Sequence, residues 1–244
     1  RYPDPYQWAI KERLAPIKGV RPGQIFLGNG SDEPIDLLYR LFCEPGEHQA
    51  VFLPPTYGMY QVSADINRVQ ALHVPLSPDF QIRLEETLAV FGPTTRLLFI
   101  CSPNNPSGNL LRRADVETLL AKFPGIVVID EAYIDFADQP SFCLQLDRYP
   151  NLVVLQTFSK AWGMAGLRLG MAFASESIVQ LLNKIKPPYN INLLTQQVAL
   201  ECLAHVASKD DMVKRILKNR QQLMGQVRQL PSVKKVFPSD ANFF

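Results

Sequence analysis

The chain has 244 residues, of which 47% are hydrophobic and 20% charged, and this composition excludes disordered, collagen-like and low-complexity proteins. Its 25 Lys and Arg residues against 23 Asp and Glu residues give a formal net charge of +2. No basic block runs along the chain, so nothing indicates binding to nucleic acid or to a membrane surface. The longest apolar runs are about five residues, whereas a membrane-spanning helix needs about 20.

The candidate metal ligands and disulfide partners are scattered. The four cysteines and three histidines are Cys43, Cys101, Cys143, Cys202, His48, His73 and His205. No Cys-x-x-C pair occurs, and a zinc site needs about four closely organised ligands. The sequence therefore predicts neither a metal site nor a disulfide framework, but buried thiols in a protein of the reducing cytoplasm.

Short apolar runs bounded by turn residues recur through the first two thirds of the chain. They occupy residues 25–27, 51–53, 71–74, 97–100, 126–129, 152–155 and 170–173. These runs do not alternate apolar with polar residues, which is typical of strands covered by helices on both faces. Helix-like stretches at 34–42, 58–66, 84–91 and 114–123 lie between them. The alternation predicts an α/β fold with a mainly parallel seven-stranded sheet.

The last part of the chain changes character. Residues 178–184, 194–205 and 210–230 have the apolar spacing of helices, and a short apolar segment follows at 233–237. We expect a large domain over 1–206 and the start of a smaller α+β domain over 207–244. Neither end of the sequence has a start or stop signal, so we expect the natural chain to be longer.

A glycine-rich turn follows the first apolar run and precedes a helix. Gly28-Asn29-Gly30-Ser31-Asp32-Glu33 allows a tight turn, and the free N–H groups of the helix start can bind an anion. Glu33 stands where a dinucleotide-binding fingerprint has its third glycine, and no Gly-Lys-Ser/Thr follows. The turn therefore favours a small phosphate over a nucleotide, although an ordinary helix cap has the same composition.

Two further clusters follow buried runs. The segment 102–108, Ser-Pro-Asn-Asn-Pro-Ser-Gly, is a rigid loop that carries two amides, one of them Asn105. Asp130 ends the run 126–129, where a carboxylate is costly unless it meets a cation. Because ligands bind at the carboxyl edge of a parallel sheet, we expect both clusters at one site. A plain turn and an aspartate paired with a structural arginine are the alternatives.

The segment 157–170 contains Lys160 in an apolar and glycine-rich context, flanked by Ser159 and followed by Arg168. A partly desolvated lysine loses its proton more easily and can attack a carbonyl. An amine of this kind, an aspartate for a pyridinium nitrogen and an anion pocket for a phosphate are the groups that pyridoxal 5'-phosphate requires.

With these residues in place, the chain resembles the fold-type I aminotransferases of class I/II, and more narrowly the histidinol-phosphate aminotransferases. The resemblance covers nearly the whole chain. Its signals are Arg1-Tyr2-Pro3, Pro-Thr-Tyr-Gly-Met-Tyr at 55–60, Asn-Asn-Pro-Ser-Gly at 104–108, Asp-Glu-Ala-Tyr at 130–133, Ser159-Lys160 with Arg168, and Lys-Pro-Pro-Tyr-Asn at 186–190.

The resemblance implies a role for each matching residue. Lys160 would bind pyridoxal 5'-phosphate covalently and later move a proton. Asp130 would keep the pyridine nitrogen protonated, and Asn105 and Tyr133 would hydrogen-bond the phenolic oxygen of the ring. The remaining cofactor contacts would come from Tyr57 on the ring face, from Gly30, Ser31, Asp32, Ser159 and Arg168 around the phosphate, and from Tyr2 of a neighbouring subunit.

The resemblance also implies a reaction and an assembly. Asn105 and Asn242 would lie on the substrate side of a homodimeric, cytoplasmic enzyme with shared sites. It would exchange an amino group between histidinol phosphate or imidazole-acetol phosphate and 2-oxoglutarate or glutamate. The arginines and the N-terminal segment with which the family binds substrate would lie outside residues 1–244.

Other functions remain open at this stage. A threonine-phosphate decarboxylase and an aromatic or branched-chain aminotransferase share the fold and the cofactor residues. A nucleotide-binding or dehydrogenase domain built on Gly28-Asn29-Gly30 is disfavoured by the missing third glycine. A serine hydrolase is disfavoured because no Gly-x-Ser-x-Gly elbow occurs.

Overall fold

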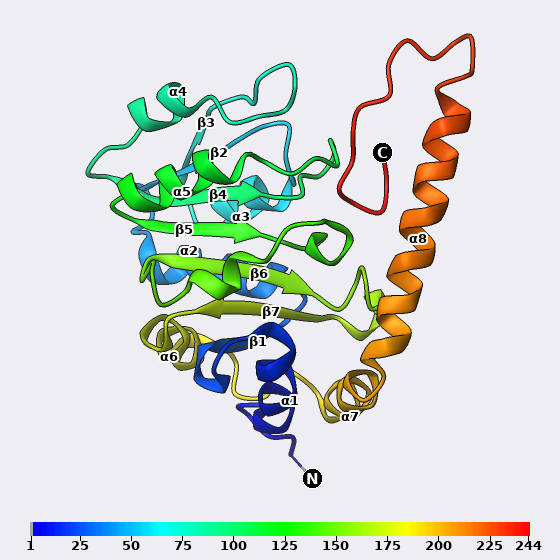
Figure 1. The fold of residues 1–244 in the computed structure, drawn as a ribbon. Helices are drawn as coiled ribbons and strands as arrows, with labels where there is room; N and C mark the ends of the chain where they lie inside the picture. Colours follow the sequence, from blue (N-terminus) through cyan, green and yellow to red (C-terminus); the bar gives the residue numbers. More distant parts are fainter. Residues whose placement is uncertain (1) are drawn as a thin grey trace.

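A single seven-stranded sheet forms the centre of the computed structural model, which describes residues 2–244 (Figure 1). The Arg1 of the expected Arg-Tyr-Pro motif lies outside the described residues. The strand order is β1-β7-β6-β5-β4-β2-β3. The strands are β1 Ile25–Asn29, β2 Gln49–Phe52, β3 Gln70–His73, β4 Thr95–Cys101, β5 Ile126–Asp130, β6 Leu152–Thr157 and β7 Leu169–Ala174.

The sheet is mainly parallel, which confirms the fold predicted from the apolar runs. Strands β3, β2, β4, β5 and β6 are parallel neighbours, whereas β7 is antiparallel to both β6 and β1. The β5–β6 register pairs Val127 with Leu152 and ends at Asp130 and Leu155. All seven expected strands are present at the expected positions.

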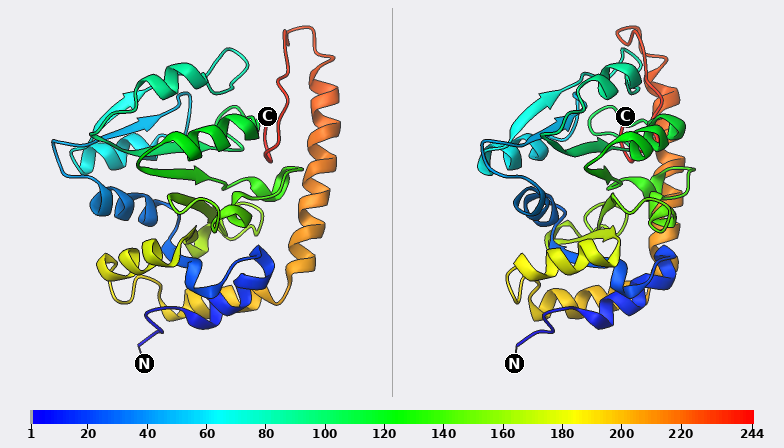
Figure 2. Two further views of the ribbon diagram at one scale, coloured as in Figure 1. Left: turned by 60° about the vertical axis from the view of Figure 1, so that its left-hand side comes forward. Right: turned by 90° about the vertical axis from the view of Figure 1, so that its left-hand side faces the viewer.

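Helices cover both faces of the sheet. They are α1 Trp8–Lys18, α2 Asp32–Phe42, α3 Met59–Ile66, α4 Leu84–Ala89, α5 Arg113–Lys122, α6 Glu176–Ile185, α7 Leu193–Leu203 and α8 Val206–Val227. Core residues of α1, α5 and α7 pack in one cluster with one face of the strands, and those of α2, α3 and α6 pack in a second cluster with the other face. Figure 2 shows the two layers on either side of the strands.

The continuous apolar runs follow from this double coverage. In β5, Val127 and Ile129 belong to the cluster that includes α5, and Val128 belongs to the cluster that includes α2. Successive side chains of a strand point to opposite faces, so both faces must be apolar when both are covered.

Two segments have a structure that the sequence patterns did not predict. Helix α1 was not predicted: it contains Pro16, which interrupts the backbone hydrogen bonds of an ordinary helix, and it has only a weak apolar stripe. The apolar segment 233–237 forms no regular strand. Phe237 instead packs against Phe80 with ring centroids 5.1 Å apart, so its burial comes from a distant aromatic contact.

Helix α8 runs along the edge of the sheet toward which β5 and β6 point (Figure 1). The C-terminal segment lies near the same edge. No helix within residues 2–244 is long and apolar enough to cross a membrane.

Candidate active site

A cavity of about 180 Å³ opens at the carboxyl edge of the sheet. Its walls come from five parts of the chain: the start of α2, the segment before α3, the loop after β4, the end of β5 and the segment after β6. The residues that line it are Ser31, Asp32, Tyr57, Cys101, Asn105, Asp130, Ala132, Tyr133, Thr157, Ser159, Lys160, Ala165 and Arg168. Nine predicted site residues are therefore gathered in one place.

One end of the cavity combines a helix N-terminus with a guanidinium group. Ser31 caps α2 without a side-chain hydrogen bond to it, so the first N–H groups of this 11-residue helix remain available. The Arg168 guanidinium lies 3.5 Å from Asp32, and the Tyr57 hydroxyl donates to the same carboxylate at 3.1 Å. Free N–H groups beside an arginine are what a phosphate group binds.

Two glycines make this end possible. Gly30 has φ +75°, and a Cβ there would lie 2.6 Å from the Arg168 guanidinium. A Cβ on Gly170 would lie 2.3 Å from the backbone nitrogen of Ser31. Any larger residue at position 170 would push the turn at 30–31 away from β7.

Asp130 lies at the floor of the cavity and is 3% exposed. Tyr60 donates to its Oδ2 at 2.8 Å, and the backbone N–H of Ala132 donates to its Oδ1 at 3.0 Å. Burial raises the pKa of Asp130, whereas these hydrogen bonds and the nearby Lys160 act in the opposite direction. The carboxylate is therefore held in place and suited to a cationic partner.

Lys160 and Asn105 face the cavity with unpaired polar groups. The Lys160 ammonium lies 5.2 Å from the centroid of the Tyr133 ring. Neither the Lys160 amine nor the Asn105 amide forms a side-chain hydrogen bond within residues 2–244, although both line the cavity. Lys160 is solvent-exposed, so the desolvation that its sequence context suggested is not observed.

The whole chain, residues 1–244, matches the family described as aminotransferase class I and II. The chain belongs to this family.

Close relatives share more than half of the sequence. The histidinol-phosphate aminotransferase of Cytophaga hutchinsonii is 58% identical over 243 residues, which are 100% of this chain and 70% of the relative. That of Bacteroides fragilis is 54% identical over 244 residues, covering 100% of this chain and 71% of the relative.

Solved structures share the fold. The histidinol-phosphate aminotransferase of Clostridium acetobutylicum has a TM-score of 0.90 at 24% identity, over 99% of this chain and 72% of that one. The enzyme of the same name from Sinorhizobium meliloti, solved in complex with pyridoxal-5'-phosphate, has a TM-score of 0.87 at 25% identity, over 99% and 66%.

Three of the residues that the resemblance to the aminotransferases singled out do not line the cavity. Gly30 lies behind it and shapes the turn before Ser31. Tyr2 is 80% exposed and stacks on Tyr189, with ring centroids 4.8 Å apart. Asn242 is exposed in the C-terminal segment.

Tyr60, which donates to Asp130 in this aminotransferase, is a site residue that was not predicted from the sequence. Tyr60 is fully buried and stacks on Phe99 at 4.8 Å, and its hydroxyl reaches the carboxylate from α3. Its place in the Pro-Thr-Tyr-Gly-Met-Tyr motif, three residues after Tyr57, was the available signal. The loop after β4 also separates its two amides: Asn104 is buried and bonded to Pro55 and Ser107, and only Asn105 faces the cavity.

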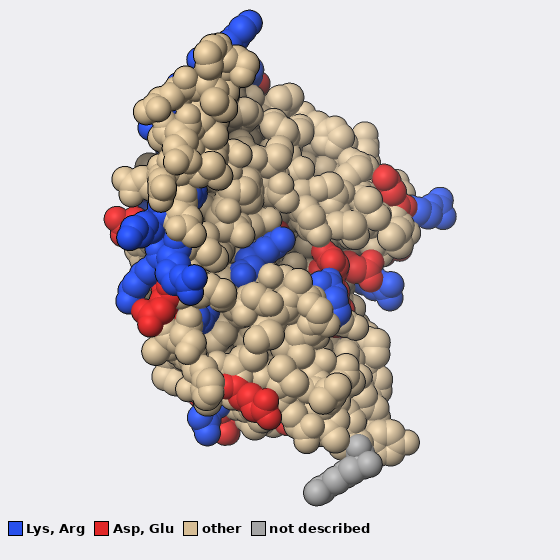
Figure 3. All heavy atoms as spheres, turned by 90° about the vertical axis from the view of Figure 1, so that its right-hand side faces the viewer, with Lys and Arg blue, Asp and Glu red and all other residues tan. Residues whose placement is uncertain are grey.

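Positive and negative side chains are both present on the side of the molecule that α8 occupies (Figure 3). Within the described chain, no group of three or more His, Cys, Asp and Glu residues could hold a metal ion. Cys43, Cys101 and Cys143 are buried free thiols, and Cys202 is partly buried.

Proposed function

We propose that this protein exchanges an amino group between L-histidinol phosphate and 2-oxoglutarate, with pyridoxal 5'-phosphate as cofactor. In the direction of histidine biosynthesis, glutamate gives the amino group and imidazole-acetol phosphate accepts it. The observation that carries the proposal is the meeting of Lys160, Asp130 and the anion-binding end in one cavity. Relatives that cover the whole chain at 48–58% identity bear the name of this activity.

The residues present fit pyridoxal 5'-phosphate. Asp130 is a buried carboxylate that already accepts from Tyr60 and the Ala132 N–H, and the ring nitrogen would be its third partner; burial makes a cationic partner favourable. The start of α2 with Ser31, Ser159 and Arg168 offers a set of donors to a phosphate. Asn105 and Tyr133 offer unpaired groups to the ring oxygen, and Tyr57 offers an aromatic wall.

When bound, the cofactor supplies an electron sink for the carbon that loses or gains the amino group. Lys160 would hold it covalently through Nζ and, once released, would carry the proton between substrate and cofactor carbons. This transfer needs an amine that can approach and leave, which the exposed Lys160 side chain can do. Asp130 would keep the ring nitrogen protonated, because the hydrogen bonds from Tyr60 and the Ala132 N–H favour its ionised form and fix the orientation of the carboxylate.

We also propose that two copies form a homodimer in the cytoplasm, with Tyr2 of each reaching the phosphate of the other. Tyr2 is exposed and cannot close its own cavity, yet it is fixed against Tyr189. Gln7 and Gln196 both donate to the carbonyl of Asp4 and tie this N-terminal segment to α7. The division into a large domain, 1–206, and the start of a small domain, 207–244, belongs to the same proposal, as does a substrate-side role for Asn242.

The proposal is tested by loading the protein with pyridoxal 5'-phosphate and reducing it with borohydride. Reduction links the cofactor permanently to the amine that holds it, and this adduct is the label. We expect the label on Lys160 in a peptide map, together with glutamate-dependent amino transfer to imidazole-acetol phosphate. Capture of the label at other lysines, or transfer that persists after Lys160 is replaced, would refute the assignment.

A further inference from the structure

Glu131 is a buried carboxylate next to the cavity to which the proposed chemistry gives no role. It is 1% exposed, and within residues 2–244 no Lys, Arg or His lies at ion-pair distance from it. A buried carboxylate without a cation is costly unless hydrogen bonds satisfy it fully. This carboxylate, one residue from Asp130, therefore depends on hydrogen bonds for its stability in the interior.

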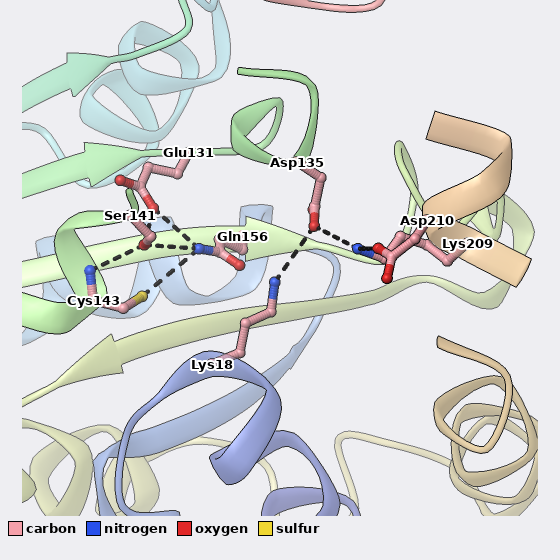
Figure 4. Close-up of polar contacts among 8 residues, drawn as sticks. All are labelled: Lys18, Glu131, Asp135, Ser141, Cys143, Gln156, Lys209 and Asp210. Carbon is pink, nitrogen blue, oxygen red and sulfur yellow. Dashed lines mark hydrogen bonds and ion pairs between the residues drawn. The ribbon is translucent and has the colours of Figure 1, made fainter. Parts of the chain in front are cut away.

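Three donors satisfy the Glu131 carboxylate, and Figure 4 draws two of them, Ser141 and Gln156. The backbone N–H of Phe142 donates to Oε1 at 2.8 Å, and the Ser141 hydroxyl and the Gln156 amide donate to Oε2, the latter at 3.0 Å. Gln156 also donates toward Ser141 and Cys143, whereas its own Oε1 has no partner in the described chain. Gln156 therefore acts only as a donor in this network, through its side-chain NH₂ group.

The place of this network explains what it can do. Asp130 and Glu131 are consecutive, so their side chains lie on opposite faces of the sheet. Gln156 and Thr157 are likewise consecutive on β6, and Thr157 lines the cavity with Asp130. The network therefore lies beneath the cavity, on the far face of the same two strands.

The backbone pairing of β5 with β6 ends just before this point. The last paired residues are Asp130 and Leu155, and the Glu131 N–H donates to the Leu155 carbonyl at 2.8 Å. Beyond Leu155, β6 pairs only with β7. The side-chain bond from Gln156 to Glu131 continues the connection beyond the last backbone pair, and joins the strand that carries Asp130 to the strand that leads to Lys160.

We propose that Glu131 and Gln156 are positioning residues, whose hydrogen bond fixes the end of β5 against the end of β6 and so sets the placement of Asp130 relative to Lys160. The inference rests on the proposed function, because both residues act through these two groups. A misplacement of about 1 Å at reacting groups can cost roughly a hundredfold in rate.

The test uses Glu131→Gln, Gln156→Glu and the double variant in the cofactor-loaded protein. Glu131→Gln removes the charge that three donors surround, and Gln156→Glu places two carboxylates together. We expect each single change to lower kcat about tenfold to a hundredfold with little change in KM. The double variant restores one donor and one acceptor with their positions exchanged, and we expect it to recover most of the lost kcat.

A matched control separates positioning from stability. Asp135→Asn breaks the ion pairs that Asp135 forms with Lys18 at 3.9 Å and Lys209 at 3.0 Å, which Figure 4 also shows. These contacts join α1, α8 and the turn after β5, but none reaches β6. We expect this variant to lose thermal stability while kcat is unchanged.

Two readouts do not depend on turnover. Visible circular dichroism of the bound cofactor reports its orientation, and hydrogen exchange in the cofactor-free protein reports opening at 129–133 and 155–160. We expect both to change in the single variants and not in Asp135→Asn. If Gln156→Glu fails to fold, Gln156→Met removes the same bond without adding a charge.

Single variants that match Asp135→Asn in kcat, dichroism and exchange would overturn the proposal, and so would a double variant as defective as the worse single one. A parent protein that binds the cofactor but does not transfer amino groups would refute the proposed function instead, and dichroism and exchange would still decide whether Glu131 and Gln156 position the two strands.

Discussion

Two polar clusters lie on opposite faces of the ends of β5 and β6, and they differ in how far their hydrogen bonds are satisfied. In the cavity, Lys160 and Asn105 have no side-chain partner in residues 2–244. On the far face, both oxygens of Glu131 receive hydrogen bonds. Lys160 is exposed and Asn105 only partly buried, so burial does not require them to be paired; their convergence on a cavity with Asp130 and Arg168 indicates a ligand site. Glu131 is buried, and its saturated network indicates a role in shaping the protein.

The largest effect is expected from the unpaired amine. Lys160→Ala removes the covalent attachment and the proton carrier, and we expect turnover to fall by about three orders of magnitude or more, since a positioned acid or base alone contributes roughly 10²–10⁴. Cofactor binding should persist in part, because Arg168 and the start of α2 are untouched. Steady-state kinetics and equilibrium dialysis measure the two effects, and multiple turnovers at the parental rate would exclude Lys160.

Asp130→Asn tests the cavity floor. An amide cannot supply the negative charge that keeps a pyridine nitrogen protonated, so we expect about a hundredfold loss of rate in both half-reactions. The fold should survive, because the amide removes a buried charge whose desolvation raises the pKa of Asp130. Rapid-mixing kinetics and thermal unfolding measure these quantities. A variant with the parental rate would make Asp130 a structural residue.

Tyr2→Phe tests whether a second copy of the chain completes the cavity by contributing its Tyr2 hydroxyl. Loss of one hydrogen bond to a charged group costs roughly 1.5–3 kcal/mol, so the cofactor off-rate should rise about tenfold or more. The exposed Tyr2 ring would still stack on Tyr189, which keeps the variant matched in structure. An active monomer, or an off-rate that ignores the change, would contradict the shared site.

Lys11→Met tests the cost of a buried polar group outside both clusters, at the ammonium of Lys11 in α1. Lys11 is 2% exposed, and burial, with the nearby Lys186, lowers its pKa to about 8 from 10.5. Below pH 8 the folded protein carries a buried charge at a cost of about 3 kcal/mol, so methionine should stabilise it there by roughly 1–3 kcal/mol.

The sign of the pH dependence follows from the lowered pKa of Lys11. Between about pH 8 and 10.5 the unfolded chain binds more protons than the folded one, so the contribution of Lys11 to stability rises with pH. The advantage of Lys11→Met should therefore shrink across this range. Denaturant unfolding at several pH values measures it, and a constant difference would show that Lys11 is not the titrating group.

Much of this arrangement could be predicted from local sequence. The seven strands were predictable because a sheet covered on both faces requires apolar residues at consecutive positions, as in 126–129. The cavity residues were predictable because polar clusters follow these runs at the carboxyl edge. Helix α1 was not, because Pro16 and a weak apolar stripe hide a helix that tertiary packing stabilises.

The remaining features depend on register and three-dimensional contact. Glu131 and Gln156 are separated by 25 positions and meet only because β5 and β6 pair in one register. Tyr60 reaches Asp130 across 70 positions from another layer. No local pattern distinguishes Asn104, which is buried in its loop, from Asn105, which faces the cavity.

The most direct test of amino transfer uses ¹⁵N-labelled L-histidinol phosphate with 2-oxoglutarate and the cofactor-loaded protein. Mass spectrometry then follows the label. The account predicts ¹⁵N in glutamate, in amounts that exceed the protein many times over, and none with Lys160→Ala. A protein that binds the cofactor at Lys160 yet leaves all ¹⁵N in histidinol phosphate would contradict it.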